Sequence, residues 1–324
     1  MTVSTTLPVT RAADLADVPT ARRWLVEDLW GDEAVGIVGG EPKCCKSFLA
    51  LDLAVAVASG APCVRRFPVA RAGRVLLFAA EDALHIVRQR LAGIARAAGH
   101  ELADLDIQVI TAPSVRLDVE RDRDALTETV DKLRPRLLVL DPFVRLHRID
   151  ENISGEVAPL LAYLRELQRR YHVAVLLVHH ARKGGAKMRA GQALRGSSEF
   201  HAWGDSNLYL RRHHGEQLTL SVEHRAAASI SNVHLVLDTA DAAVALRTIE
   251  HGDTDAELAV PSTAPDLTLE QRLVEHLAGT AVPITATALR KLCQVRNTVL
   301  HHALAALVDA GRVRKGRTGY ALAR

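Results

Sequence analysis

The segment that most constrains the fold runs from Val35 to Ser47 and reads V-G-I-V-G-G-E-P-K-C-C-K-S. It follows the phosphate-loop pattern G-x-x-x-x-G-K-[ST], with Gly40, Lys46 and Ser47 in the first, seventh and eighth places. Cys45 stands where the second glycine is expected. An apolar run enters the loop and an apolar stretch with helical spacing leaves it, so a strand, a loop and a helix are predicted in the order that phosphate binding requires.

The residue types of this loop suit a nucleotide. Gly39 and Gly40 allow a sharp turn that directs backbone N–H groups at phosphates, and the helix N-terminus adds partial positive charge. Lys46 is expected to reach the β- and γ-phosphates of ATP, and Ser47 to bind Mg²⁺. A glycine-rich turn that binds nothing is the alternative. The predicted nucleotide-binding residues are Gly39, Gly40, Glu41, Pro42, Lys43, Cys44, Cys45, Lys46, Ser47 and Phe48.

Length and composition indicate a globular chain of two domains. The 324 residues are 48% hydrophobic and 24% charged. No long apolar run and no export signal at residues 1–9 are found, so a cytoplasmic protein without a membrane segment is expected. Four cysteines without C-x-x-C spacing argue against disulfides and against a zinc site. The thiol of Cys45, at a helix N-terminus beside Lys43 and Lys46, is expected to have its thiolate favoured, so that Cys44 or Cys45 reacts readily with an alkylating reagent. The alternative is that Cys45 is merely a tolerated small residue.

Apolar runs alternate with amphipathic stretches along most of the chain. Buried strands are predicted at 34–38, 74–80, 107–111, 136–140 and 173–178, and helices at 47–58, 84–98, 122–133 and 156–171. This alternation predicts an α/β fold with a parallel sheet. Later runs predict antiparallel strands at one edge, at 207–211, 217–223 and 234–238. The predicted organisation is an N-terminal segment, an α/β core, a linker and a small C-terminal domain, at 1–30, 31–250, 251–264 and 265–324.

Two predicted strands end in acidic residues. Glu81 and Asp82 follow the second strand, and Asp141 follows the fourth. Ligands of parallel sheets bind at the carboxyl ends of the strands, where a carboxylate can activate water or hold Mg²⁺. Asp141 is the predicted metal ligand together with Ser47. The alternative is that Glu81 and Asp82 serve only as a cap of the helix that begins near Leu84, because acidic residues favour helix N-termini.

Five motifs in order resemble a known family, namely G-E-P-K-x-x-K-S, A-A-E-D, L-V-L-D-P-F-V-R-L-H-R-x-D-E-N, V-L-L-V-H-H-A-R-K-G and L-R-G-S-S-E-F. Over residues 20–240 the chain looks like the RecA-like P-loop ATPases of the RepA-type hexameric helicase group. The resemblance implies a RecA-like core that hydrolyses ATP with Mg²⁺ at subunit interfaces, usually in a six-membered ring, and that moves or remodels DNA. It also implies that Glu81 is the catalytic carboxylate and that His179 or His180 senses the γ-phosphate.

Basic residues are predicted to serve DNA and the neighbouring subunit. Residues 181–192 form a glycine-rich basic stretch at the position of a pore loop, where single-stranded DNA would meet Lys183, Lys187 and Arg189. A trans-acting arginine that stabilises the transferred phosphoryl group is assigned to Arg225. Its alternatives are Arg195, Arg211 and Arg212.

The last sixty residues are basic, with nine Lys or Arg against four acidic residues from Pro265 to Arg324, a net charge of +5. Helical spacing at 269–278, 286–293 and 296–310, followed by a glycine-rich hairpin, resembles a winged helix-turn-helix. The predicted contacts to duplex or single-stranded DNA are Arg296, Asn297, Arg314, Lys315 and Arg317. A module that contacts only protein is the alternative.

Together these features predict an ATP-dependent DNA-acting RecA-like ATPase, a ring-forming helicase or DNA-remodelling motor that assembles as a homo-oligomer, with a hexamer favoured. The alternative is a regulator without motor activity, in which ATP binding switches the exposure of a DNA-binding tail.

Overall fold

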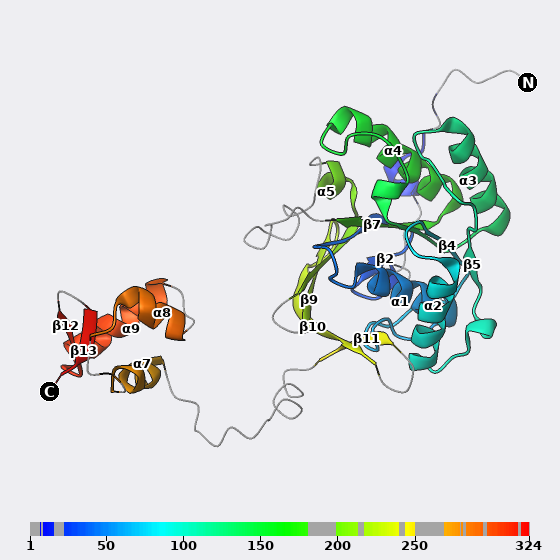
Figure 1. Ribbon diagram of the computed structural model, residues 1–324. Helices are drawn as coiled ribbons and strands as arrows, with labels where there is room; N and C mark the ends of the chain where they lie inside the picture. The colour runs from blue at the N-terminus through cyan, green and yellow to red at the C-terminus, as the bar shows by residue number, and fades with distance from the viewer. Residues whose placement is uncertain are drawn as a thin grey trace, which may run out of the picture. The chain divides into compact units, whose positions relative to one another are not determined.

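Figure 1 shows a computed structural model of the chain. It describes residues 7, 9–15, 23–180, 199–212, 217–239, 244–249, 269–278, 280, 283–293, 297–316 and 319–323. The chain divides into two compact units, Met1–Thr254 and Asp255–Arg324. In the part of the chain that the structure describes, no helix has the length and apolar character needed to span a membrane.

A nine-stranded sheet organises the first unit, with strand order β11-β10-β9-β8-β3-β7-β6-β4-β5. The strands from β3 to β7 are parallel and match the five apolar runs predicted from the sequence, which confirms the α/β fold with a parallel sheet. Their bounds are β3 Val35–Gly40, β4 Val75–Ala79, β5 Ile107–Val109, β6 Leu137–Asp141 and β7 Ala174–His180. The later strands are β8 Ser206–Arg212, β9 Leu218–His224, β10 Ile230–Asp238 and β11 Ala245–Thr248.

One strand runs in a direction that the sequence did not predict. β8 was expected to be an antiparallel addition, but it pairs parallel with β3 and antiparallel with β9. The parallel part of the sheet is therefore one strand wider than predicted. The change to antiparallel pairing comes only at β9, because β8 and β9 follow each other closely along the chain while β8 reaches β3 through a crossover.

Helices cover both faces of the sheet (Figure 1). On one face α1 (Lys46–Ser59) and α2 (Leu84–Ala97) pack on Leu77 and Val139 of the sheet. On the other face α3 (Glu120–Leu133), α4 (Ser154–Tyr171) and the short α5 (Glu199–Trp203) pack on Leu76 and Leu138. Neighbouring residues of one strand thus point into different cores, as the two-residue period of a strand requires.

The core begins earlier than residue 31. β1 (Trp24–Val26) pairs with β2 (Trp30–Gly31), and the side chains of Leu25, Val26, Leu29 and Trp30 are fully buried in the α1 face of the core. Residues 24–30 therefore belong to the α/β unit and not to a separate N-terminal segment. These strands are two and three residues long, too short to show a period in the sequence.

The described residues of the second unit form three helices and a hairpin with a core of its own. The helices are α7 (Leu269–Ala278), α8 (Ala286–Cys293) and α9 (Asn297–Asp309), and β12 (Val313–Gly316) pairs antiparallel with β13 (Gly319–Leu322). Ile284, between the first two helices, forms a β-bridge with Tyr320 of the hairpin. The core consists of Leu273, Leu277, Leu289, Leu300, Leu304, Leu307, Val313 and neighbours. The predicted linker, 251–264, lies outside the described residues.

Candidate active site

The loop between β3 and α1 has the backbone shape that its motif predicts. At Gly40, φ is +158°, and a Cβ there would lie 2.4 Å from the Leu210 carbonyl oxygen and 2.6 Å from Cys44 Sγ, so only glycine fits. Lys43 and Cys45 are left-handed, with φ of 64° and 62°. Cys45 is the N-cap of α1 and takes the conformation for which the phosphate-loop pattern provides glycine. For a residue with a side chain this conformation costs about 1–2 kcal/mol.

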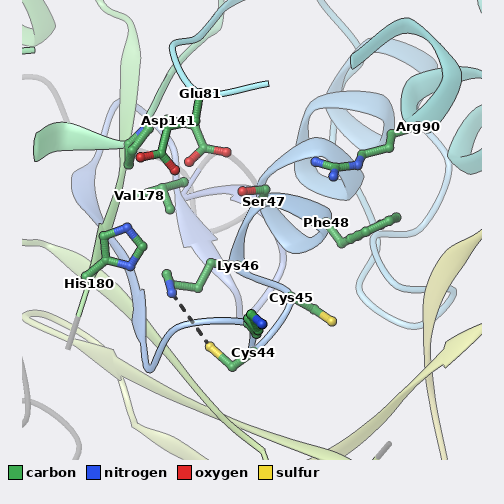
Figure 2. A pocket seen from close by; sticks show the side chains of 12 residues that line it. Cys44, Cys45, Lys46, Ser47, Phe48, Glu81, Arg90, Asp141, Val178 and His180 are labelled. Atoms are coloured by element: carbon green, nitrogen blue, oxygen red, sulfur yellow. Dashed lines mark hydrogen bonds between the residues drawn. The ribbon is translucent and has the colours of Figure 1, made fainter. Parts of the chain in front are cut away.

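Lys46 is held inside the loop. Its side chain is buried, at 5% exposure, and Nζ donates hydrogen bonds to the carbonyl oxygens of Gly40, at 3.0 Å, and Glu41, at 2.8 Å. Nζ also lies 3.9 Å from Cys44 Sγ, the contact drawn in Figure 2. Burial lowers the pKa of Lys46. The two loop carbonyls thus hold the ammonium group of Lys46 within the loop.

A pocket of about 320 Å³ opens in front of this loop. Its walls come from the loop, the start of α1, and the carboxyl ends of β4, β6 and β7. It is lined by Lys43, Cys44, Cys45, Lys46, Ser47, Phe48, Glu81, Arg90, Asp141, Pro142, Val178 and His180. Of the predicted nucleotide-binding set, Lys43 to Phe48 line the pocket, whereas Gly40 and Glu41 act through the carbonyls that hold Lys46. Gly39 lies within β3 and Pro42 in the turn that follows it.

Ser47 and Asp141, the predicted metal ligands, both line the pocket. The Ser47 side chain lies next to Asp141, which is 8% exposed. Burial raises the pKa of Asp141 to about 6; the nearby Asp82 and Glu81 raise it further, while Ser47 and Lys46 oppose the shift. A hydroxyl and a carboxylate in contact, in a site where negative charge is costly, fit the oxygen ligands of Mg²⁺.

The two acidic residues after β4 have different partners. Glu81 lines the pocket and its Oε1 accepts a hydrogen bond of 2.9 Å from Arg145 Nε. Asp82 forms an ion pair with Arg90 of α2. The guanidinium of Arg90 also lies over the ring of Phe48, 5.1 Å from its centroid. Figure 2 shows Phe48 and Arg90 on one side of the pocket, with the carboxylates of Glu81 and Asp141 beyond Ser47.

The adjacent histidines at the end of β7 lie in different environments. His180 lines the pocket. His179 is 1% exposed and stacks on the ring of Phe200 in α5. The alternation of a strand thus brings one of the two predicted sensor residues to the site and places the other behind it. Among the described residues no group of three or more His, Cys, Asp or Glu side chains is placed to hold a metal ion.

Cys44 is not placed to be a reactive thiolate, and the reactive thiolate expected at Cys45 stays a prediction. Its side chain is fully buried, and burial raises the pKa of its thiol despite the nearby Lys46. Cys45 is half-buried, and its Sγ accepts a hydrogen bond of 3.4 Å from Nη2 of Arg212 at the end of β8. In Figure 2 the Cys45 sulfur points away from Lys46. The desolvation of Cys44 outweighs the attraction of the loop charges.

Arg225 does not lie at this pocket. It follows β9, is 54% exposed, and donates through Nη2 to the carbonyl oxygens of Ala202 and Trp203. Its Nε lies 3.5 Å from Asp205, a carboxylate that also pairs with Arg165. The guanidinium is therefore engaged within its own protomer.

The predicted DNA-binding residues are only partly described. Lys183, Lys187, Arg189, Arg296 and Arg317 lie outside the described residues, as does Arg195. Asn297 is the first residue of α9. Arg314 and Lys315 are exposed on β12, and Lys315 Nζ lies 6.0 Å from the centroid of the Tyr320 ring.

Two arginines near the site were not assigned to it from the sequence: Arg90 lines the pocket, and Arg145 bonds to Glu81. Arg145 belongs to a basic run directly after Asp141, which is a weak signal for proximity to the site. Arg90 is one of several arginines on an amphipathic helix, and no pattern in the sequence distinguishes it.

Comparison with known proteins agrees with the fold. The family model AAA_25, an AAA domain, matches residues 3–186. The ATPase domain of G40P matches with a TM-score of 0.52 and 14% identity, over 66% of this chain and 84% of that chain. The RadB recombinase matches with a TM-score of 0.50 and 16% identity, over 68% of this chain and 92% of that chain. A DnaB-like replicative helicase, whose structure also addresses its interactions with primase, matches with a TM-score of 0.51 and 14% identity, over 66% of this chain and 57% of that chain.

The parallel sheet, the phosphate loop and these neighbours define a RecA-like P-loop ATPase. Within that class, the chain belongs to the AAA domain family AAA_25.

Proposed function

We propose that this ATPase is a ring-forming, ATP-dependent motor that acts on DNA as a helicase or remodelling enzyme. The observation that carries the proposal is the meeting, in one pocket, of the Lys46 ammonium, the Ser47–Asp141 pair and the Glu81 carboxylate at the ends of three different strands. Only the fold brings these groups together, and together they supply each charge that phosphoryl transfer to water requires.

Each group has a separate task in the proposed hydrolysis. Lys46 and the loop N–H groups bind the β- and γ-phosphates of ATP. Ser47 and Asp141 would hold Mg²⁺, which would supply positive charge to the phosphate oxygens. Glu81 orients the attacking water and accepts its proton, while Arg145 keeps its carboxylate in place. His180, at the mouth of the same pocket, is the better placed γ-phosphate sensor of the two histidines.

The nucleobase has its own proposed position. Lys46 and Ser47 direct the phosphates to one end of the pocket, and Phe48 and Arg90 form a wall of ring and guanidinium at the other. Both groups are planar, and both favour stacking with a π-system. We assign the base to this wall.

Contacts with DNA are proposed at two places. Lys183, Lys187 and Arg189 would meet single-stranded DNA in a pore. The second unit would bind DNA as a winged helix, through Arg296 and Asn297 at the start of α9 and through Arg314, Lys315 and Arg317 on its hairpin. Three helices followed by a hairpin whose strand bridges to Ile284 support this assignment, and so does the net charge of +5.

A ring, in which a hexamer is favoured, would place each pocket against a neighbour. The trans-acting arginine proposed from the sequence is Arg225. Because Arg225 bonds to its own protomer at Ala202 and Asp205, a role at the neighbour's phosphates requires it to exchange these bonds on assembly. Arg211 and Arg212 are the last two residues of β8, at the carboxyl ends of the parallel strands, where the phosphate loop also lies. They remain the alternatives there.

One experiment separates the motor from a regulator that ATP only switches. Native mass spectrometry with Mg-ATP and single-stranded DNA should show a closed homo-oligomer, and the same preparation should displace a labelled strand from a forked duplex. The variant Lys46→Ala should fail in strand displacement. Nucleotide-dependent DNA binding without any strand displacement would support the regulator instead.

A further inference from the structure

Three buried rings pack behind the pocket. The imidazole of His179 is stacked on the phenyl ring of Phe200, with centroids 4.3 Å apart and planes inclined by 21°. Phe143 packs edge-on against both rings, with its centroid 6.1 Å from His179 and 5.3 Å from Phe200. All three side chains are almost fully inaccessible to solvent. We refer to His179, Phe143 and Phe200 as the ring cluster.

The ring cluster is joined through the backbone to groups of the pocket. His179 precedes His180, and the two side chains lie on opposite faces of β7. Phe143 comes two residues after Asp141 and begins the one-turn helix Phe143–Arg145. A ring that fixes one face of β7 therefore also fixes the direction in which His180 leaves the other face.

The same one-turn helix links the ring cluster to the proposed catalytic carboxylate. Phe143, at its first position, points into the core, while Arg145, at its last, reaches Glu81 through the hydrogen bond of 2.9 Å. A shift of the backbone of this three-residue turn would displace both side chains. The packing of Phe143 thus fixes the backbone from which the Arg145 side chain extends to Glu81.

A histidine is an uncommon choice for simple filling of a core, because its ring must leave water. Its flat ring does match the face of Phe200, as aromatic packing favours. We propose that the ring cluster is a positioning device that holds His180, Asp141 and the Arg145–Glu81 pair in register for hydrolysis. The inference rests on the proposed function, and within it His179 is a positioning residue that does not touch the nucleotide.

Two substitutions at one position test the proposal in the full-length chain. His179→Phe keeps a flat ring on Phe200, and His179→Ala removes it. Tyr171→Leu is the matched control, because Tyr171 is a buried ring of the same hydrophobic core at the far end of α4. The first readout needs no activity: the NMR signals of labelled histidine in the nucleotide-free protein, with the His180 signal assigned by its loss in His180→Gln.

The proposal expects the His180 signal to stay in place in His179→Phe and in Tyr171→Leu, and to shift or broaden in His179→Ala. In ATP hydrolysis, His179→Ala should lower kcat by about tenfold or more while KM changes by less than about twofold, since misplaced groups slow the chemical step. His179→Phe should recover most of kcat. Tyr171→Leu should lower the melting temperature without lowering kcat.

Two results would overturn the proposal: an unmoved His180 signal in His179→Ala, or a loss of kcat in Tyr171→Leu as large as that in His179→Ala. Failure of the proposed function has a different appearance. In that case the wild-type protein would not hydrolyse ATP at all, and the His180 signal would still decide whether the ring cluster positions this residue.

Discussion

Arg145 Nε lies 2.9 Å from Glu81 Oε1 and donates a hydrogen bond to it, which joins the turn after β6 to the residue that follows β4. Both side chains are exposed, at 61% for Arg145 and 44% for Glu81. A pair with this exposure contributes less than about 1 kcal/mol to stability. Its position at the pocket indicates that it orients the carboxylate and does little to hold the fold.

Arg145→Ala should therefore slow hydrolysis without unfolding the protein. We expect kcat to fall by about tenfold, because a misplaced base transfers the proton less well, and the melting temperature to change little. Steady-state phosphate release checks this. Arg148→Ala is the control, since Arg148 belongs to the same basic run after Asp141 and its backbone N–H bonds to Asp118. If Arg145→Ala and wild type released phosphate at equal rates, Arg145 would have no role in orienting Glu81 for hydrolysis.

Asp141 predicts how the stability of the nucleotide-free protein depends on pH. Its pKa is about 6 in the folded protein and about 3.9 in an unfolded chain. The folded state holds a proton that the unfolded state has lost between these values. The protonated Asp141 therefore contributes to the free energy of unfolding fully below about pH 4, and this contribution is lost as the pH rises through about 6. The total loss is about 3 kcal/mol at most.

Asp141→Asn should accordingly be more stable than wild type at pH 7.5 and similar to it near pH 4. Denaturant unfolding of the nucleotide-free protein, in the presence of a chelator, measures this difference. Asp131→Asn on the exposed face of α3 is the control and should show no such gain. A variant Asp141→Asn that is destabilised at pH 7.5 would show that the carboxylate has a stabilising partner in the absence of metal.

Cys45 predicts a stabilising substitution. Its φ of 62° disfavours any side chain, so Cys45→Gly should raise the free energy of unfolding by about 1 kcal/mol. Cys44→Gly makes the same chemical change one residue earlier, at a buried position that is not left-handed, and should lower stability. Equal and negative effects of the two substitutions would contradict the left-handed assignment of Cys45. Cys45→Val should have a lower free energy of unfolding than either glycine variant, because a β-branched side chain tolerates the left-handed conformation poorly.

The tail predicts the salt dependence of DNA binding. Deletion of residues 265–324 removes a net charge of +5 and should flatten the dependence of log affinity on log salt. The double variant Arg314→Ala with Lys315→Ala should reduce the slope by about two, and Arg290→Ala on α8 by less. Titrations of a labelled oligonucleotide at several salt concentrations supply the slopes. If the slope were the same with and without residues 265–324, the second unit would be assigned to protein contacts and not to DNA binding.

Local patterns were sufficient to predict the frame of the fold. The strands that carry the site are apolar runs with acidic or glycine ends, so β3, β4 and β6 could be placed from the sequence to within one or two residues. The short strands β1, β2 and β11 were not predicted, because two to four residues show no period and their burial depends on tertiary contacts. The direction of β8 also depends on where the chain crosses the sheet.

The site was predictable where one element carries the signal. Lys46, Ser47, Glu81 and Asp141 each stand at a strand end or in the loop motif, and the structure brings all four to one pocket. The choice between His179 and His180 needed the register of β7. Arg145 is 64 residues from Glu81 along the chain, so its contact could not be inferred from spacing.

ATP hydrolysis tests the central claim most directly. Phosphate release should be measured for the full-length wild type, Lys46→Ala and Glu81→Gln, each with Mg-ATP and with or without single-stranded DNA, beside binding of a fluorescent ATP analogue. The wild type should hydrolyse ATP faster with DNA. Lys46→Ala should lose binding and turnover, and Glu81→Gln should bind nucleotide but hydrolyse it about 10²–10⁴-fold more slowly. Turnover in Lys46→Ala equal to that of wild type would contradict the assignment of this pocket as the ATPase site.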